Sequence, residues 1–172
     1  IEADITCMGK IIGGGMPVGA YAAKEKIMDN VAPLGGMYQA GTLSGSPVAM
    51  ACGIATLKEL KALNAWGKAE DYALEIKNSL ENAAKEHGIA ITVNQFGSMV
   101  NPFFTKEKVT DFASAQTSDV KLFSRFFWAM AENGVYIPPS QFEAWFIPVV
   151  LNDSDLEDIK IAIQNSFQSL TI

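Results

Sequence analysis

Residues 4–15 have the sequence DITCMGKIIGGG, in which a short apolar run leads into a lysine and then three consecutive glycines. Residues 5–8 are typical of a buried β-strand, and the glycines at positions 13–15 are typical of a turn. Residues 18–23 predict a second strand after that turn. Lys10 is therefore expected at the end of a strand, beside a glycine-rich turn.

The segments that follow predict helices alternating with short strands. Ser46 and Pro47 predict the start of a helix, because serine caps helices and proline is tolerated at the first helical position. The first turns of this helix, residues 48–55, are apolar all round and predict burial on every side. Later periodicity predicts a helix ending at Gly88, strands at 89–93 and 100–104, a helix ending at Gly134, strands at 135–137 and 145–150, and a last helix capped by Ser154 with Glu157.

The composition is that of a folded globular chain. Of 172 residues, 49% are hydrophobic and 19% are charged, and the net charge of −6 disfavours a surface that binds nucleic acid. No apolar run approaches the roughly 20 residues that a membrane-spanning helix needs. Cys7 and Cys52 have apolar neighbours, which predicts buried free thiols in a reducing compartment, the cytoplasm. The first residue, Ile1, is neither an initiator methionine nor the start of a signal peptide, so we expect the chain to begin inside a longer protein.

Several known motifs lack residues that they require in this sequence, so the chemistry that they would carry is excluded. Gly9-Lys10 is followed by Ile11 instead of serine or threonine, so it does not form a P-loop for a nucleoside triphosphate. His87 is the only histidine, so neither a histidine triad nor a multi-histidine metal site can be built from this sequence. No metal is expected.

Lys10 is the remaining candidate for covalent chemistry. A lysine held among apolar groups loses hydration of its charged form, and its neutral amine is then a usable nucleophile towards an aldehyde. An exposed lysine at a strand end with no catalytic role is also common. Spacing alone leaves both interpretations open.

Four motifs resemble those of the class III, fold type I enzymes that use pyridoxal 5′-phosphate (PLP). They are DITCMGKIIGGGMPVGAY at 4–21, MYQAGTLSGSP at 37–47, NQFGSM at 94–99 and GVYIPPSQFEA at 134–144. The first two are typical of the whole superfamily, and the last is typical of the glutamate-1-semialdehyde 2,1-aminomutase family. The resemblance therefore covers nearly the whole chain.

The resemblance implies a role for four residues. Lys10 would form the covalent link with the cofactor aldehyde and move protons between cofactor and substrate. Gly41 and Thr42 would bind the cofactor phosphate of the neighbouring subunit, although a capped loop without a ligand is the alternative. Glu143 lies near the region where many class III transaminases place an arginine for a substrate carboxylate, so it would attract the amino end of a diamine intermediate. A solvated glutamate in a proline-rich loop is the alternative there.

The resemblance also implies the fold class, which is α/β: the C-terminal part of a fold type I PLP-dependent transferase. Residues 1–47 would be the last strands of the PLP-binding large domain, residues 48–88 connecting helices, and residues 89–172 a small α+β domain. The intact homodimer would convert glutamate-1-semialdehyde, a small amino-acid aldehyde, to 5-aminolevulinate for tetrapyrrole synthesis, using PLP and its pyridoxamine form.

Two alternatives to this function are open. One is a class III ω-amino acid transaminase, which would need an external amino acceptor. The other is a non-catalytic folding and dimerisation module. The isolated chain is expected to be inactive and can lack the cofactor, because the other cofactor-binding groups of the family precede the segments that this sequence contains.

Overall fold

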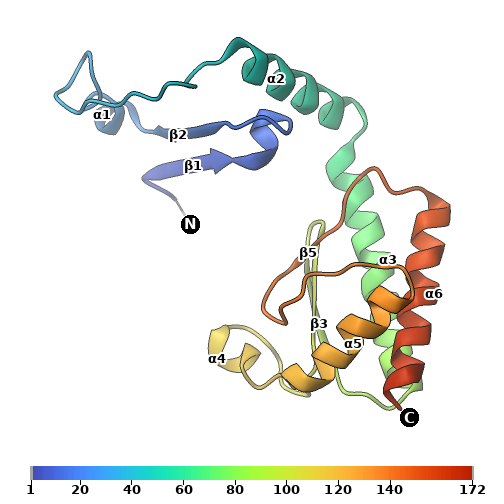
Figure 1. The fold of residues 1–172 in the computed structure, drawn as a ribbon. Helices are drawn as coiled ribbons and strands as arrows, with labels where there is room; N and C mark the ends of the chain where they lie inside the picture. The colour runs from blue at the N-terminus through green and yellow to red at the C-terminus, as the bar shows by residue number, and fades with distance from the viewer. Residues whose placement is uncertain (1, 172) are drawn as a thin grey trace. The chain divides into compact units, whose positions relative to one another are not determined.

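The computed structural model describes residues 2–171 as two compact units, one up to Asn64 and one from Ala65 (Figure 1). The boundary falls inside the predicted connecting segment 48–88, whose first helix belongs to the first unit and whose second helix belongs to the second. Asn64 itself has a φ of 47°, a left-handed conformation that asparagine adopts more readily than most residues. No helix within residues 2–171 has the length and apolarity needed to cross a bilayer.

The first unit is built on an antiparallel strand pair and one long helix. Its elements are β1 (Ile5–Gly9), the 3₁₀ helix η1 (Lys10–Gly13), β2 (Gly19–Ala23), α1 (Glu25–Met28) and α2 (Pro47–Ala62). The strands pair in register from Ile5 opposite Ala23 to Gly9 opposite Gly19. Both predicted strands are confirmed, and the predicted turn contains a short helix that begins at Lys10.

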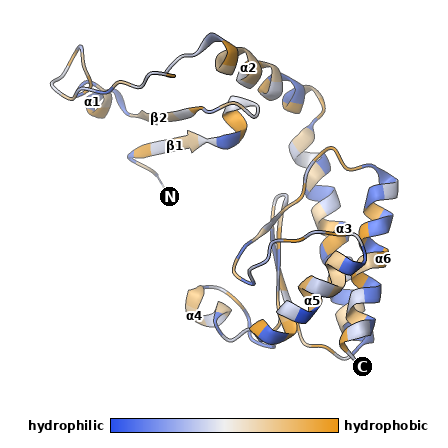
Figure 2. Ribbon diagram, viewed as in Figure 1, coloured by the Kyte–Doolittle hydropathy of each residue, from blue (hydrophilic) through white to orange (hydrophobic). Residues whose placement is uncertain are grey.

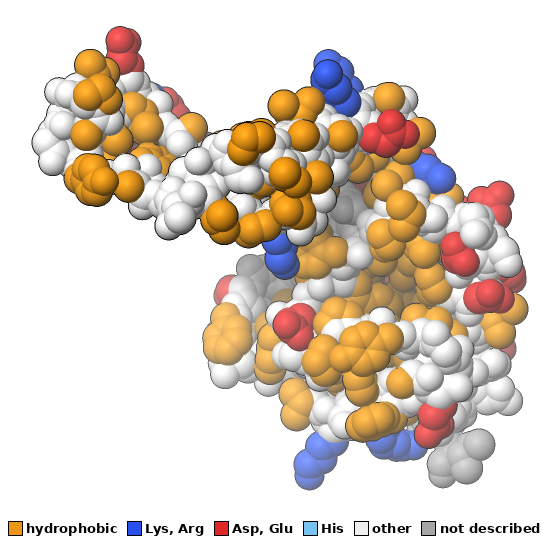
Figure 3. Space-filling model, turned by 45° about the horizontal axis from the view of Figure 1, so that its top comes forward, with side chains coloured by type: hydrophobic (Ala, Val, Ile, Leu, Met, Phe, Trp, Pro, Cys, Tyr) orange, Lys and Arg blue, Asp and Glu red, His pale blue; other side chains and the backbone are white. Residues whose placement is uncertain are grey.

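Helix α2 begins at Pro47 as predicted, with Ser46 before it, but the side chain of Ser46 makes no capping hydrogen bond. The predicted burial of residues 48–55 on every side is wrong within the described chain. Only Ala49 and Gly53 of α2 are buried, whereas Val48 and Ile54 are more than half exposed. The ribbon coloured by hydropathy marks the first turns of α2 as hydrophobic (Figure 2), and the space-filling view shows apolar side chains on the surface of the first unit (Figure 3).

The two cysteines differ from the prediction for the same reason. Cys7 in β1 is exposed and Cys52 in α2 is half-buried. Both are free thiols, as predicted, but their apolar neighbours along the chain do not form a core around them. Apolar sequence neighbours predict burial only where another layer of the fold covers them.

The second unit is a small antiparallel sheet covered by helices. The sequence predicts such an α+β arrangement for residues 89–172, whereas the unit begins earlier, at Ala65. Its elements are α3 (Ala65–Glu86), β3 (Thr92–Phe96), β4 (Met99–Phe103), α4 (Phe112–Ala115), α5 (Val120–Glu132), β5 (Trp145–Phe146) and α6 (Asp153–Leu170). The strand order is β3-β4-β5. Helix α3 packs against β3, β4 and α6, and α5 packs against α6 (Figure 1).

The ends of several elements differ from the sequence prediction. Helix α3 does stop before Gly88, which has a φ of 66°, as a helix-ending glycine should. The predicted strand at 135–137 is absent, and the one at 145–150 is reduced to two residues, because only Met99 and Val100 of β4 offer it a pairing edge. Helix α6 is capped by Asn152 together with Asp155, instead of Ser154 with Glu157.

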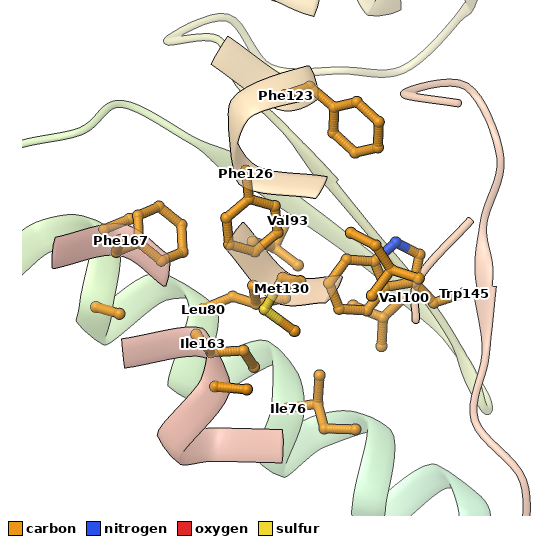
Figure 4. Close-up of a cluster of buried hydrophobic side chains, with 14 of the residues drawn as sticks. Ile76, Leu80, Val93, Val100, Phe123, Phe126, Met130, Trp145, Ile163 and Phe167 are labelled. Atoms are coloured by element: carbon orange, nitrogen blue, oxygen red, sulfur yellow. The ribbon is translucent and has the colours of Figure 1, made fainter. Parts of the chain in front are cut away.

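An aromatic cluster forms the core of the second unit (Figure 4). Phe126 and Phe167 are fully buried, and their ring centroids lie 5.0 Å apart. Phe104, the residue that follows β4, lies 5.3 Å from Phe126, and Trp145 stacks on Phe126 at 6.4 Å with 7° between the rings. One ring, that of Phe126, therefore joins α5, α6, β4 and β5.

We expect Phe126→Ala to destabilise the second unit by roughly 3–5 kcal/mol, because it removes a large buried ring and leaves a cavity between four elements. Phe96→Ala is the matched control, since Phe96 is 81% exposed in β3; its cost should stay below about 1 kcal/mol. Urea unfolding followed by tryptophan fluorescence measures both. Equal losses of stability in the two variants would contradict the packing described here.

Candidate functional site

Lys10 lies where β1 ends and η1 begins, as the sequence predicts. Its φ of 56° puts a residue with a full side chain in the left-handed region, which costs of order 1–3 kcal/mol. Only Lys10 and Asn64 share this property among the non-glycine residues of the described chain. Such strain gathers at functional sites, so the backbone independently marks Lys10 as a candidate.

The surroundings of the Lys10 side chain differ from the prediction. The residue is exposed, so the groups within residues 2–171 do not hold its amine in apolar surroundings. The strand that leads to it is exposed as well, at every position of β1. The placement of Lys10 at a strand end is therefore confirmed, and its predicted desolvation by neighbouring residues of this chain is not found.

The position of η1 is set by close packing against α2. A Cβ atom on Gly53 of α2 would overlap the carbonyl oxygen of Ile12, the residue in the middle of η1. Gly14, which follows η1 with a φ of 57°, lies equally close to the carbonyl group of Cys52. Two backbones that approach this closely leave room only for glycine. The close approach holds the helical turn that starts at Lys10.

The loop at 41–46 consists of two successive tight turns. The N–H of Ser44 donates to the carbonyl of Gly41 at 3.0 Å, and the N–H of Ser46 donates to that of Leu43 at 3.1 Å. Thr42 lies in the first turn, and neither its hydroxyl nor its N–H has a hydrogen-bond partner within residues 2–171. An exposed pair of free donors at one residue suits a phosphate oxygen.

A groove of about 670 Å³ runs between β2, this loop and α2. Gly41 lines it together with Tyr21 and Gln39, two polar side chains that the sequence analysis did not single out. Lys10 and Thr42 are not among the lining residues. The pairing of the two strands could have pointed to Tyr21. Tyr21 in β2 lies opposite Cys7 in β1, and β1 is the strand that leads to Lys10.

Glu143 belongs to the second unit and lies in the loop that precedes β5. Its side chain is exposed, and its N–H donates to the carbonyl of Ser140 at 3.1 Å, which closes a turn. The residues two positions away on either side, Gln141 and Trp145, are buried. The structure therefore presents this carboxylate from a firmly held loop, in a different unit from Lys10 and Thr42.

Two titratable groups have clearly shifted pKa values, and neither is a predicted site residue. Hydrogen bonds from the backbone N–H and the hydroxyl of Ser114 lower the pKa of Asp111, the cap of α4. The hydrogen bond to Glu75 raises the pKa of Lys160. Within residues 2–171 no group of three or more histidine, cysteine, aspartate or glutamate side chains is placed to hold a metal ion.

Comparisons with known proteins show which proteins this chain is similar to. The family model described as Aminotransferase class-III matches residues 1–165. A protein named glutamate-1-semialdehyde 2,1-aminomutase from Sulfurihydrogenibium sp. (strain YO3AOP1) is 46% identical over 171 residues, which are 99% of this chain and 40% of the relative. The chain thus spans about 40% of the length of the curated relative that it matches.

Solved structures show the same fold. An ω-transaminase from Sphaerobacter thermophilus superposes with a TM-score of 0.88 at 24% identity, over 97% of this chain and 39% of that one. A structure described as a transaminase with PLP bound superposes with a TM-score of 0.82 at 26% identity, over 99% of this chain and 39% of that one. Both matches extend across the two units.

We expect Gly53→Ala to destabilise the first unit, although the same change in an ordinary helix stabilises by about 0.5–1 kcal/mol. The added methyl group would force η1 away from α2, at a cost of about 1–3 kcal/mol. Hydrogen exchange of residues 10–15 and 47–62 should therefore become faster. Ala55→Gly, at an exposed position of α2, is the control for helix propensity alone; unchanged or slower exchange in Gly53→Ala would contradict the close approach.

Proposed function

Because the chain belongs to the class-III aminotransferase family, we propose that the protein containing it moves an amino group within one carbon skeleton, from glutamate-1-semialdehyde to 5-aminolevulinate. The observation that carries this proposal is the 46% identity, over 99% of the chain, to a relative named as that aminomutase. The strained backbone at Lys10 and the free donors of Thr42 support it from the structure.

Lys10 is the residue that we propose binds the cofactor covalently. PLP, when bound, supplies an aldehyde carbon that accepts an amino group and returns it. The Lys10 amine stands at the start of η1, where the left-handed backbone and the packing of Gly53 hold its Cα in one place. A primary amine held in this way can form the link to an aldehyde and can afterwards carry a proton at its nitrogen.

Thr42 is proposed to hold the cofactor phosphate. Its hydroxyl and N–H both donate, and the turns around it leave both free within residues 2–171. Gly41 precedes it in a tight turn, where an added Cβ would approach the hydroxyl of Ser44 at 2.8 Å. We further propose that the phosphate belongs to the cofactor of a second subunit, so that the working enzyme is a homodimer.

Glu143 is proposed to attract the amino end of a diamine intermediate, which carries a second amino group. An exposed carboxylate attracts an ammonium group and repels a carboxylate, which is the opposite of what an arginine at this place would do. The sign of the charge at this position therefore distinguishes two reactions: movement of an amino group within one molecule, and its exchange between two amino acids.

An ω-transaminase is the second candidate function, because the motifs around Lys10 and Thr42 are typical of the whole class III superfamily and a solved ω-transaminase has the same fold. Fold likeness at 24% identity is equally compatible with either reaction. The two differ in their need for an external amino acceptor, which only the transaminase has. The non-catalytic alternative concerns the isolated segment of 172 residues. In that case the segment supplies only folding and dimerisation contacts.

The remaining assignments are proposals of the same kind. Residues 1–47 are assigned to the cofactor-binding domain, 48–88 to a connection and 89–172 to the small domain. The cytoplasmic location rests on the two free cysteines, Cys7 and Cys52, which fit a reducing compartment.

Lys10→Ala in the full-length protein should lower turnover by about 10²–10⁴-fold, because it removes the group that carries the proton. Borohydride treatment with PLP, followed by mass spectrometry, should label the wild-type peptide that contains Lys10 and not the variant. Lys26→Ala, at an exposed lysine of α1, is the control and should change neither result. Normal turnover in Lys10→Ala would rule out the proposed function.

Glu143→Gln should lower kcat/KM for the aminomutase reaction by about tenfold, because it removes the charge that attracts the second amino group. Glu132→Gln, at an exposed glutamate that ends α5, is the matched control. The assay is run with and without an added keto acid. Turnover that requires the keto acid would favour the transaminase over the aminomutase.

A further inference from the structure

One edge of β4 is only partly covered by a neighbouring strand. On the other edge, β3 pairs with β4 along all five residues, from Met99 to Phe103. On this edge, β5 pairs only with Met99 and Val100. In an antiparallel ladder alternate residues turn their main-chain groups to the same edge, so those of Pro102 and Phe104 face the edge that β5 leaves free. Both residues are buried, and unpaired main-chain groups there would be costly.

The side chain of Gln141 fills this gap. Its Nε2 donates to the carbonyl oxygen of Pro102 at 2.7 Å, and its Oε1 accepts from the N–H of Phe104 at 3.4 Å. Gln141 is 3% exposed, so both hydrogen bonds are shielded from water. The Gln141 amide presents a donor and an acceptor to this edge in one plane, as a peptide group does, while its second N–H is not needed there. It therefore takes the place of a residue of a neighbouring strand.

Pro102 explains why a side chain suits this edge better than a longer β5. Proline has no N–H, so a strand neighbour opposite it would have a carbonyl without a donor. The glutamine amide offers its donor to the Pro102 carbonyl and reaches past the proline to the next N–H that faces this edge, that of Phe104. β5 can therefore begin only at Trp145 without leaving this edge unsatisfied.

Gln141 is one of two anchors that lie on either side of Glu143. The other is Trp145, which pairs with Val100 on the same edge of β4, is 5% exposed and stacks on Phe126. Between the anchors, the N–H of Glu143 is held by Ser140 at 3.1 Å. The chain is thus tied to one strand edge two residues before and two residues after Glu143, while the Glu143 carboxylate itself is exposed.

We infer that Gln141 is a positioning residue: its buried amide ties the loop to the edge of β4 and thereby fixes where the carboxylate of Glu143 stands. This inference rests on the role proposed for Glu143. Phe142, which lies between the two, packs its ring 5.7 Å from that of Phe112 in α4 and steadies the loop from its outer side. Removing the amide frees the loop at its first anchor, and the carboxylate then samples many positions.

The anchor itself is tested by hydrogen exchange in the 172-residue chain. Gln141→Met keeps the length of the side chain and removes both hydrogen bonds, so the amides of Phe104 and Glu143 should exchange about tenfold faster, while that of Val100 stays unchanged. Gln116→Met, at an exposed glutamine in the same unit, is the matched control and should leave all three unchanged. Unchanged exchange at Glu143 in Gln141→Met would overturn the inference.

If Gln141→Met does not fold by circular dichroism, Gln141→Glu replaces it. This variant keeps an acceptor for the Phe104 N–H and loses the donor to the Pro102 carbonyl. Faster exchange at Glu143 is again the expected result, and wild-type exchange there would again overturn the inference.

The positioning role is tested by a double-variant cycle in the full-length enzyme. Gln141→Met should lower kcat/KM about as much as Glu143→Gln does, and the double variant should be no slower than Glu143→Gln alone, because Gln141 acts only through Glu143. Additive losses would show that Gln141 acts on the fold in general and would overturn the inference. If Glu143→Gln by itself leaves kcat/KM unchanged, the proposed function of Glu143 is refuted. The positioning role is then refuted as well, even if the exchange result holds.

Discussion

The approach of the η1 backbone to the backbone of α2 is the contact on which the candidate site depends. Gly53 and Gly14 make it possible, because a Cβ at either position would occupy the space of a carbonyl group on the other segment. The contact fixes the helical turn that begins at Lys10, and with it the left-handed backbone at that residue. The backbone of Lys10 is thus placed by main-chain atoms instead of by a side-chain network, which suits the covalent cofactor link proposed for its amine.

The second unit supports its candidate residue by a different means. Its aromatic core joins α5, α6, β4 and β5 through Phe126, and the same core buries Trp145 at the start of β5. An exposed carboxylate has few contacts of its own that could hold it. Glu143 therefore owes its position to the buried residues beside it, one fixed by packing and the other by hydrogen bonds to a strand edge.

The burial predicted from the sequence and the burial found in the structure disagree at the apolar side chains of α2. An uninterrupted apolar run such as residues 48–55 is typical of a helix that is covered on every side. The residues described here cover only the side that carries Ala49 and Gly53. Burial is a property of what packs against a segment, so the pattern predicts that a covering surface is needed but not which part of a protein supplies it.

Local signals were sufficient for the strands at β1 and β2, for Pro47 as the first residue of α2 and for the end of α3 before Gly88, because each depends on residues adjacent in the chain. The motifs around Lys10, Thr42 and Glu143 were likewise sufficient to identify the family, because each motif lies within one short segment of the sequence. Tertiary structure alone decided the left-handed conformation of Lys10, the two-residue length of β5 and the burial of Gln141 against β4. These depend on main-chain groups that lie far apart in the sequence, and only folding brings such groups within hydrogen-bonding or van der Waals distance.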